Sequence, residues 1–246
     1  MAANWNTAEL AGHTIEVFAP EQPKADVTLL ILPDFGERVS ASAELMSVLA
    51  ERQLPAVAPA GESCWWLDRP EPAFDDEMTA IGYLIEHVVP FIEQRFGVRP
   101  PGVKLLGRGV GGQGVLQLAF RRPKDFPAVA TIDPAIDFHE LHGRGTVIDE
   151  LFPNREAARQ QTALLRLHPA GWPRRMRLIA DRQGFWFGGA DKLEMKLKSM
   201  GIPIDTTFEE SGDGDGAHFF EMHVASAVAF LLTERIALPV VPPDRY

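Results

Sequence analysis

Residues 103–114, VKLLGRGVGGQG, are the most informative segment of the chain about its fold. It starts with a mostly apolar run, and five glycines follow between Gly107 and Gly114. Glycine allows a tight turn and a close approach of backbone to backbone. The residues after the turn are again apolar enough to pack a helix against a sheet. The stretch therefore predicts a buried strand, a sharp turn at Gly109 and a helix.

The composition restricts both the architecture and the partners. A chain of 246 residues with 46% hydrophobic and 24% charged content predicts one globular domain over residues 1–246. The net charge of -10 argues against a nucleic-acid partner. One cysteine, Cys64, excludes an intramolecular disulfide and a cysteine-rich metal site. No run approaches the roughly 18 apolar residues of a membrane helix, so we expect a cytoplasmic protein without a membrane partner.

Strand-like and helix-like segments alternate along the chain, which is typical of a doubly wound, mostly parallel α/β sheet. The predicted strands are residues 13–20, 27–35, 54–60, 103–106, 129–132, 177–180 and 204–208. The predicted helices are residues 40–53, 75–96, 112–120 and 219–236. Pro90 predicts a kink near the last turns of the second helix.

Residues 136–172 interrupt this alternation with histidines, glycines and prolines between two predicted core strands. An insertion here would lie over the carboxyl edge of the sheet, where open α/β sheets hold their ligands. A short cap or pocket wall is one interpretation, and a simple surface excursion is the other.

Three motifs carry a resemblance to a known family. They are GRGVGGQG at residues 107–114, FPAVA at residues 126–130, and DGAHFF at residues 215–220. Together with the order of strands they resemble the α/β-hydrolase fold, and within it the esterase D group that includes S-formylglutathione hydrolases and feruloyl esterases. The resemblance covers nearly the whole chain and implies an α/β-hydrolase sheet with a nucleophile elbow.

The resemblance also implies a catalytic triad, and this chain departs from it. The family's elbow, G-x-S-x-G-G-x-G, carries a nucleophilic serine at the position of Gly109. His218 matches the family's histidine before the final helix. Asp181 is the candidate for the acid, although related sequences imply an aspartate nearer Gly184, and Asp191 would serve only if its helix were unwound. Asp181 as a strand end without a catalytic role is the alternative.

The resemblance implies an oxyanion hole made of two backbone amides. Val110 would donate the first, and Phe35 or Asp34, in the loop after an early strand, the second. A carboxylate at Asp34 would oppose an oxyanion unless it points away.

The segment GESCWWLDR, residues 61–69, follows a predicted strand and is expected at the same sheet edge. Trp65, Trp66 and, further along the chain, Trp186 are candidates for pocket walls, and core packing is the alternative. Cys64 could act as a displaced nucleophile with His218, or it could be a small packed residue.

A dinucleotide site is a rival interpretation, because Gly107-x-Gly109-x-x-Gly112 also reads G-x-G-x-x-G, with Asp133 where a ribose-binding acid would fall. That fingerprint normally opens a domain, whereas about three strands precede it here. Among metal candidates, His218 and His223 are five residues apart, about 140° around a helix. We therefore expect no cofactor and no metal.

These observations predict a pseudo-hydrolase that lacks the serine nucleophile at Gly109 and binds a small, ester-like molecule. The first alternative is an active carboxylic-ester hydrolase with a displaced nucleophile and His218 as base. The second is an NAD-type oxidoreductase.

Overall fold

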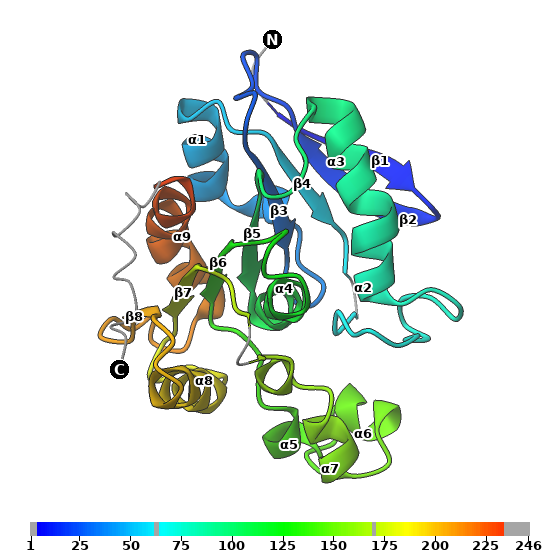
Figure 1. The fold of residues 1–246 in the computed structure, drawn as a ribbon, viewed down its shortest axis with the longest axis vertical. Coiled ribbons are helices and arrows are strands. Elements are labelled where there is room, and N and C mark those ends of the chain that lie inside the picture. The colour runs from blue at the N-terminus through cyan, green and yellow to red at the C-terminus, as the bar shows by residue number, and fades with distance from the viewer. Residues whose placement is uncertain (1–3, 62–63, 169–170, 234–246) are drawn as a thin grey trace, which may run out of the picture.

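The computed structural model describes residues 4–61, 64–168 and 171–233, and eight strands in this part of the chain form one sheet. Their order across the sheet is β1-β2-β4-β3-β5-β6-β7-β8 (Figure 1). The strands are β1 (Trp5–Leu10), β2 (His13–Phe18), β3 (Thr28–Leu32), β4 (Ala56–Pro59), β5 (Val103–Arg108), β6 (Ala128–Ile132), β7 (Arg175–Ile179) and β8 (Asp205–Thr207). Strands β3 to β8 pair in parallel, while β2 runs antiparallel to both β1 and β4. This confirms the predicted doubly wound, mostly parallel sheet.

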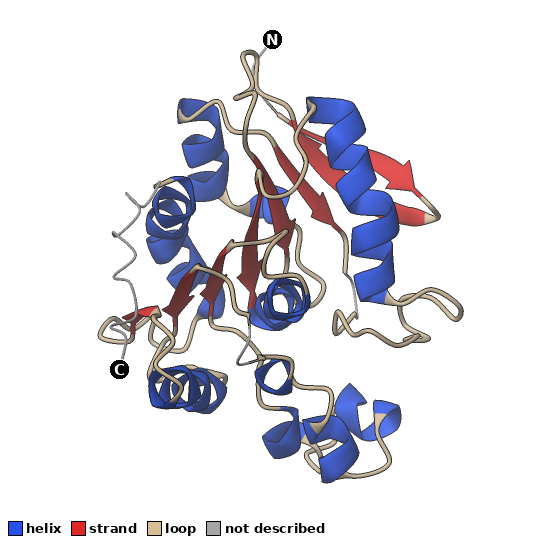
Figure 2. Cartoon of the chain, in the orientation of Figure 1, coloured by secondary structure: helices blue, strands red, loops and turns tan. Residues whose placement is uncertain are grey.

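Helices cover both faces of the sheet, as Figures 1 and 2 show. Helices α1 (Ala43–Glu51) and α9 (Gly216–Leu232) pack on one face and share an apolar cluster with it. The other face carries α2 (Ala80–Tyr83), the π-helical turn η2 (Leu84–Val88), α3 (Val89–Phe96), α4 (Gly109–Arg121) and α8 (Phe187–Ser199). None of the described helices is both long and apolar enough to cross a membrane.

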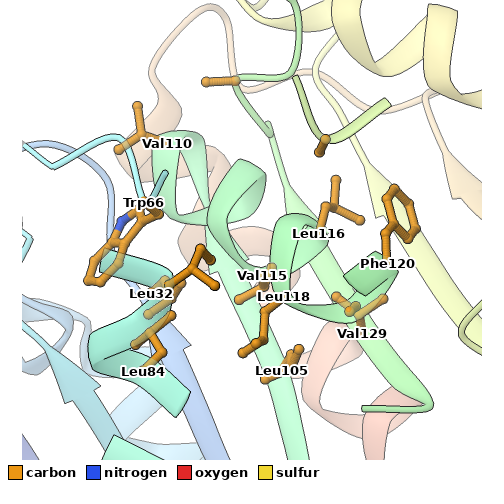
Figure 3. Packing of buried hydrophobic residues seen from close by; sticks show 14 of the residues in the cluster. Leu32, Trp66, Leu84, Leu105, Val110, Val115, Leu116, Leu118, Phe120 and Val129 are labelled. Atoms are coloured by element: carbon orange, nitrogen blue, oxygen red, sulfur yellow. The ribbon is translucent and has the colours of Figure 1, made fainter. Parts of the chain in front are cut away.

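The core is centred on β3 and β5, whose apolar residues are buried on both sides of the sheet. Figure 3 shows Leu32 and Leu105 among the buried side chains around α4, with Val115 and Leu118 of the helix itself. Each such side chain contributes about 1.5–3 kcal/mol when it leaves water. The helix that starts at the turn after β5 is therefore held tightly on the sheet.

Helix α4 begins at Gly109, three residues before the predicted start. Its first turn lies against the end of β3. A Cβ at Gly111 would lie 2.0 Å from the carbonyl oxygen of Leu32, so no larger residue fits there without a backbone shift. The glycines thus bring the start of α4 close to the neighbouring strand.

The structure differs from the sequence prediction in two other elements. Strand β1 was not predicted, because it lies at the edge of the sheet and its residues are all half-buried or exposed. The second predicted helix begins at Ala80 rather than residue 75. Asp75 instead accepts hydrogen bonds from the amides of Glu77 and Met78, both at 2.8 Å, which holds that segment in a turn.

Pro90 lies immediately after the π-helical turn η2. Proline lacks an amide donor and its ring crowds the carbonyl four residues back. A wider turn accommodates both effects, so the helix continues through α3 instead of ending.

The described residues between β6 and β7 include several short helices, at the lower edge of the view in Figure 2. They are α5 (Phe138–Leu141), α6 (Val147–Leu151), α7 (Arg155–Arg159) and the 3-10 turn η3 (Ala163–Leu165). Asp149 fixes this segment by accepting hydrogen bonds from the amides of Gly143 and Gly145, at 2.5 and 2.7 Å. Residues 169–170 of the predicted insertion, and residues 234–236 of the last predicted helix, lie outside the described residues.

Candidate functional site

The turn between β5 and α4 has the geometry of a nucleophile elbow. Gly109 is buried and adopts a φ of +52°, a left-handed conformation that strains any residue with a side chain. Its carbonyl accepts a hydrogen bond of 2.9 Å from the amide of Ala135, after the neighbouring strand β6. The elbow is therefore fixed by adjacent strands, with glycine at its centre.

The carboxylate of Asp34 lies directly over Gly109. A Cβ built on Gly109 would lie 2.1 Å from the Asp34 Cγ, well inside contact distance. Oδ1 of Asp34 accepts hydrogen bonds from the amides of Val110, at 3.1 Å, and Phe35, at 2.9 Å. The two amides that the resemblance implied for an oxyanion hole thus converge on one oxygen, and that oxygen belongs to the protein.

This orientation answers the question that the sequence left open. The carboxylate of Asp34 does not point away from the two amides but towards them. Asp34 and Phe35 both lie in the loop after β3. This loop therefore supplies the Phe35 amide and also the Asp34 carboxylate that accepts its hydrogen bond.

Asp181 follows β7 and is 1% exposed. Its Oδ2 accepts hydrogen bonds from the amides of Gly212, at 2.8 Å, and Gly214, at 3.4 Å, and its Oδ1 accepts one from Gln183, at 2.8 Å. Burial would raise the pKa of Asp181, but these amides outweigh it and hold the pKa below its usual range. The carboxylate therefore orders the loop that leads into α9.

Asp133, at the end of β6, is 7% exposed and has a φ of +47°. Its Oδ1 accepts a hydrogen bond of 2.7 Å from the amide of Asp181. Burial, together with the negative charge of Asp181, raises the pKa of Asp133 to about 6. The residue considered for ribose binding is thus buried and hydrogen-bonded to the neighbouring strand end.

His218 is the third residue of α9 and is exposed. Its amide donates a hydrogen bond of 3.1 Å to Oδ1 of Asp215, the residue that caps the helix. Within the described chain its imidazole ring has no hydrogen-bond partner. In particular, the Asp181 carboxylate is bound to backbone amides and not to this ring. Asp191 lies within the uninterrupted helix α8, so it does not reach the site either.

Four rings gather on the side of Gly109 that faces the short helices after β6. We call Phe35, Trp65, Phe138 and Trp186 the aromatic cluster. The ring of Trp65 lies at the centre, with centroid distances of 4.8 Å to Phe35, 5.2 Å to Phe138 and 6.5 Å to Trp186. Trp65 is 2% exposed, so its ring is packed inside the cluster, whereas Trp186 is half-buried and lines a separate cavity of about 310 Å³.

Cys64 and Trp66 are core residues, which corrects their assignment to a pocket. Trp66 is fully buried and packs against Gly114 of α4, and Figure 3 shows it beside that helix. Cys64 is 1% exposed, and burial together with the neighbouring Glu71 raises the pKa of its thiol well above the usual range. Only a thiolate is a good nucleophile, so this thiol is inert in its position.

An open cavity of about 600 Å³ lies on the other side, between the loop after β3 and the start of α9. Its polar lining includes Glu37, Arg108 and His218, and we call it the charged cavity. The guanidinium of Arg108 donates a hydrogen bond to Glu37 and lies 5.7 Å from the centre of the Phe220 ring. Burial raises the pKa of Glu37, although the charge of Arg108 opposes the shift.

The walls of the charged cavity are held by two further carboxylates. Glu16, on β2 and 5% exposed, accepts a hydrogen bond from the amide of Ser40 at 3.3 Å and pairs with Arg38 at 3.6 Å. Glu221, on α9, accepts one from the amide of Glu44 at 3.0 Å, at the start of α1. Both acids are therefore engaged in fixing the loop and the helix around the cavity.

Arg108 and Glu37 were not among the site residues predicted from the sequence. Arg108 occupies a position that the elbow motif leaves free, and only its place at the end of a buried strand marked it as unusual. Glu37 lies two residues beyond Phe35, and nothing in its local sequence pairs it with Arg108.

Comparison with known proteins agrees with this architecture. The model of the family described as "Putative esterase" matches residues 32–215. No curated protein matches the sequence. Among solved structures, the S-formylglutathione hydrolase from Staphylococcus aureus is 13% identical, with a TM-score of 0.73 over 94% of this chain and 99% of that one.

Two further solved structures are similar. A ferulic acid esterase is 14% identical, with a TM-score of 0.72 over 93% of this chain and 98% of that one. The S-formylglutathione hydrolase from Agrobacterium tumefaciens is 15% identical, with a TM-score of 0.68 over 92% and 94% of the two chains. At these identities the likeness establishes the fold.

Proposed function

The chain belongs to this esterase family of α/β-hydrolases, and we propose that within it the protein is a pseudo-hydrolase, which binds a small molecule without hydrolysing it. The proposal treats residues 1–246 as one domain in which α5 to η3 form a short cap.

The observation that carries the proposal is the position of the Asp34 carboxylate. It fills the space above Gly109 in which the side chain of a nucleophile would stand, and it accepts hydrogen bonds from Val110 and Phe35. An ester carbonyl must reach both places to react. The carboxylate excludes it sterically, and its negative charge opposes a developing oxyanion.

The magnitudes support the same conclusion. Removing the serine of a Ser-His-Asp enzyme costs on the order of a million-fold in turnover, and the oxyanion hole and substrate binding account for most of what remains. Here the two amides are already satisfied by Asp34. We therefore expect even the residual activity of a serine-free esterase to be absent.

The positions of the triad acid and histidine, Asp181 and His218, also support a protein without hydrolytic activity. Asp181 is hydrogen-bonded to the amides of Gln183, Gly212 and Gly214. Among the described residues, no carboxylate is hydrogen-bonded to the imidazole of His218, as the acid of a catalytic triad would be. A displaced nucleophile is not favoured, because the Cys64 thiol is buried and its pKa is raised. The dinucleotide alternative is not favoured either, since Asp133 is bound to the amide of Asp181.

The test is the hydrolysis of p-nitrophenyl acetate and butyrate by four proteins. They are the natural sequence, its His218→Ala variant, the double variant Asp34→Gly with Gly109→Ser, and that double variant with His218→Ala added. We expect the natural protein to release p-nitrophenolate at the rate of buffer alone. The double variant should give a burst of about one equivalent and an acyl adduct detectable by intact mass, because its serine then faces free amides.

The His218→Ala change should abolish that burst, since His218 is the base nearest the elbow by family position. Turnover by the natural protein that disappears with His218→Ala alone would overturn the proposal, because another nucleophile would then be at work.

A further inference from the structure

The charged cavity has the size and the lining of a ligand site. Its volume of about 600 Å³ falls within the roughly 300–1,000 Å³ of small-molecule pockets. Ile31, Val39 and Phe220 form apolar wall, and Glu37, Arg108 and His218 provide the polar groups. A ligand with an apolar body and one polar end would match this division.

Arg108 is the cation best placed to fix that polar end. Its side chain is only 13% exposed, so water competes weakly for it. A guanidinium offers five N–H donors, and among the described residues Arg108 donates only through Nη1, to Glu37. Donors remain for a carboxylate, which a guanidinium can bind in a two-pronged geometry.

Glu37 is the group that a ligand would replace. Its side chain is 36% exposed and lies in the loop after β3, next to Gly36, whose φ is +61° and whose Cα faces open space. Burial raises the pKa of Glu37, so the site disfavours its charged form. Moving this carboxylate into water relieves that cost and releases Arg108.

The other charges around the cavity are engaged elsewhere. Arg38 pairs with Glu16, Glu221 caps the start of α1, and Asp215 accepts from the amides of the first turn of α9. His218, at the rim, is the remaining polar group and provides a second donor. Two guanidiniums line the cavity, but Arg38 pairs with Glu16, which leaves Arg108 as the cation available to a ligand. One available guanidinium beside Glu37 and Glu221 suits a single carboxylate better than a doubly charged phosphate.

We propose that the charged cavity binds a small monocarboxylic acid with an apolar body, whose carboxylate displaces Glu37 from Arg108. The inference rests on the proposed function, since it names the ligand class of a site at which no hydrolysis occurs. It assigns Arg108 as the residue that binds the acid, and Glu37 as an intramolecular competitor for the same guanidinium.

The experiment measures binding of phenylacetate by isothermal titration calorimetry, with phenylacetamide as the neutral analogue of the same shape. The variants are Arg108→Met, which keeps length without charge, and Glu37→Gln, which removes the competing charge. Lys192→Met is the matched control, because Lys192 pairs with Asp137 and Glu140 outside this cavity.

We expect the natural protein to bind phenylacetate and not phenylacetamide. Arg108→Met should weaken phenylacetate at least tenfold, Glu37→Gln should tighten it severalfold, and Lys192→Met should leave it unchanged. Opposite effects of Arg108→Met and Glu37→Gln cannot come from a general loss of folding, which would weaken both.

Equal affinity for the acid and the amide, or a Glu37→Gln variant that binds more weakly, would overturn the inference. Neither outcome depends on ester hydrolysis, which the p-nitrophenyl assay reads separately. An active esterase that still binds phenylacetate through Arg108 would remove the pseudo-hydrolase proposal alone.

Discussion

The aromatic cluster and the charged cavity lie on opposite sides of the same elbow, and they differ in how closely their central residues are packed. On one side the ring of Trp65 is 2% exposed and touches three other rings. On the other, a space of about 600 Å³ surrounds Arg108. Phe35 and Glu37, two residues apart in one loop, contribute to the two sides separately, and Asp34 lies over Gly109 itself.

This difference in packing predicts that the aromatic cluster contributes mainly to folding stability and the charged cavity mainly to ligand binding. Rings that exclude water contribute mainly to stability, through buried area and edge-to-face contacts. The pair of Arg108 and Glu37, 13% and 36% exposed, contributes less to stability than a buried ring, but it can exchange partners with a ligand. We therefore expect substitutions in the aromatic cluster to lower mainly the free energy of unfolding. Substitutions in the charged cavity should change mainly the affinity for a ligand.

The largest expected effect is that of Trp65→Ala. Removing this ring leaves a cavity among three aromatic partners and should lower the free energy of unfolding by about 3–5 kcal/mol. Urea denaturation measures it. Arg108→Met is the matched change across the elbow and should cost about 1–3 kcal/mol, because it removes a charged hydrogen bond from a partly buried pair whose other member, Glu37, is 36% exposed. Equal losses for the two variants would break the comparison.

A smaller loss is expected for Gly109→Ser, at the boundary between the two sides. The new Cβ collides with the Asp34 carboxylate, and the left-handed backbone adds strain of about 1–3 kcal/mol. Adding Asp34→Gly removes the collision. The double variant should therefore recover the stability that Gly109→Ser loses through the collision, but not the stability lost through backbone strain. Thermal unfolding of both single variants and the double variant gives the coupling between the two positions. Strictly additive effects would mean that the Asp34 carboxylate moves aside freely.

The smallest effect concerns Asp133 and pH. Its pKa is about 6 in the folded protein, above the ordinary value of 3.8, so the folded state holds a proton that the unfolded state releases. Stability from this group therefore falls as pH rises from about 4 to about 6, by about 2 kcal/mol in order of magnitude. Asp133→Asn should be more stable than the natural protein at pH 7.5.

The Asn side chain still accepts a hydrogen bond from the Asp181 amide, so this variant isolates the charge. The advantage of Asp133→Asn should disappear near pH 4, where urea denaturation gives the comparison. Asp181 acts in the opposite sense, because its lowered pKa stabilises the fold above pH 4 and the benefit is lost below it. An Asp133→Asn advantage that persists at pH 4 would contradict the assignment.

Much of the fold could be predicted from the sequence, because local patterns determine it. The buried strand, the glycine turn at Gly109 and the helix after it follow from one stretch of residues, and the remaining parallel strands follow from their apolar runs. Strand β1 could not be predicted in this way, since an edge strand that buries little has no apolar pattern. The start of α2 depends on a side-chain cap, in which the Thr79 hydroxyl accepts a hydrogen bond from the amide of Gly82, rather than on periodicity.

The site was less predictable, because it depends on the orientation of side chains and on contacts between distant segments, which the residue types alone do not determine. The sequence showed that Asp34 departs from the family, but its direction is set by the packing of β3 beside β5. The pairing of Arg108 with Glu37 joins residues 71 positions apart. The tryptophans of residues 61–69 were candidate walls, whereas the burial of Trp65 and Trp66 comes from contacts with segments distant in sequence.

Under the function proposed above, the carboxylate over Gly109 also has an evolutionary consequence. A single codon change that returned serine to position 109 would produce a crowded, strained elbow and no activity, so selection could not reward it. Loss of the Asp34 carboxylate would have to come first, and alone it confers no catalysis. Ester hydrolysis at the elbow therefore requires substitutions at both positions 34 and 109, and neither substitution alone gives an advantage that selection could act on.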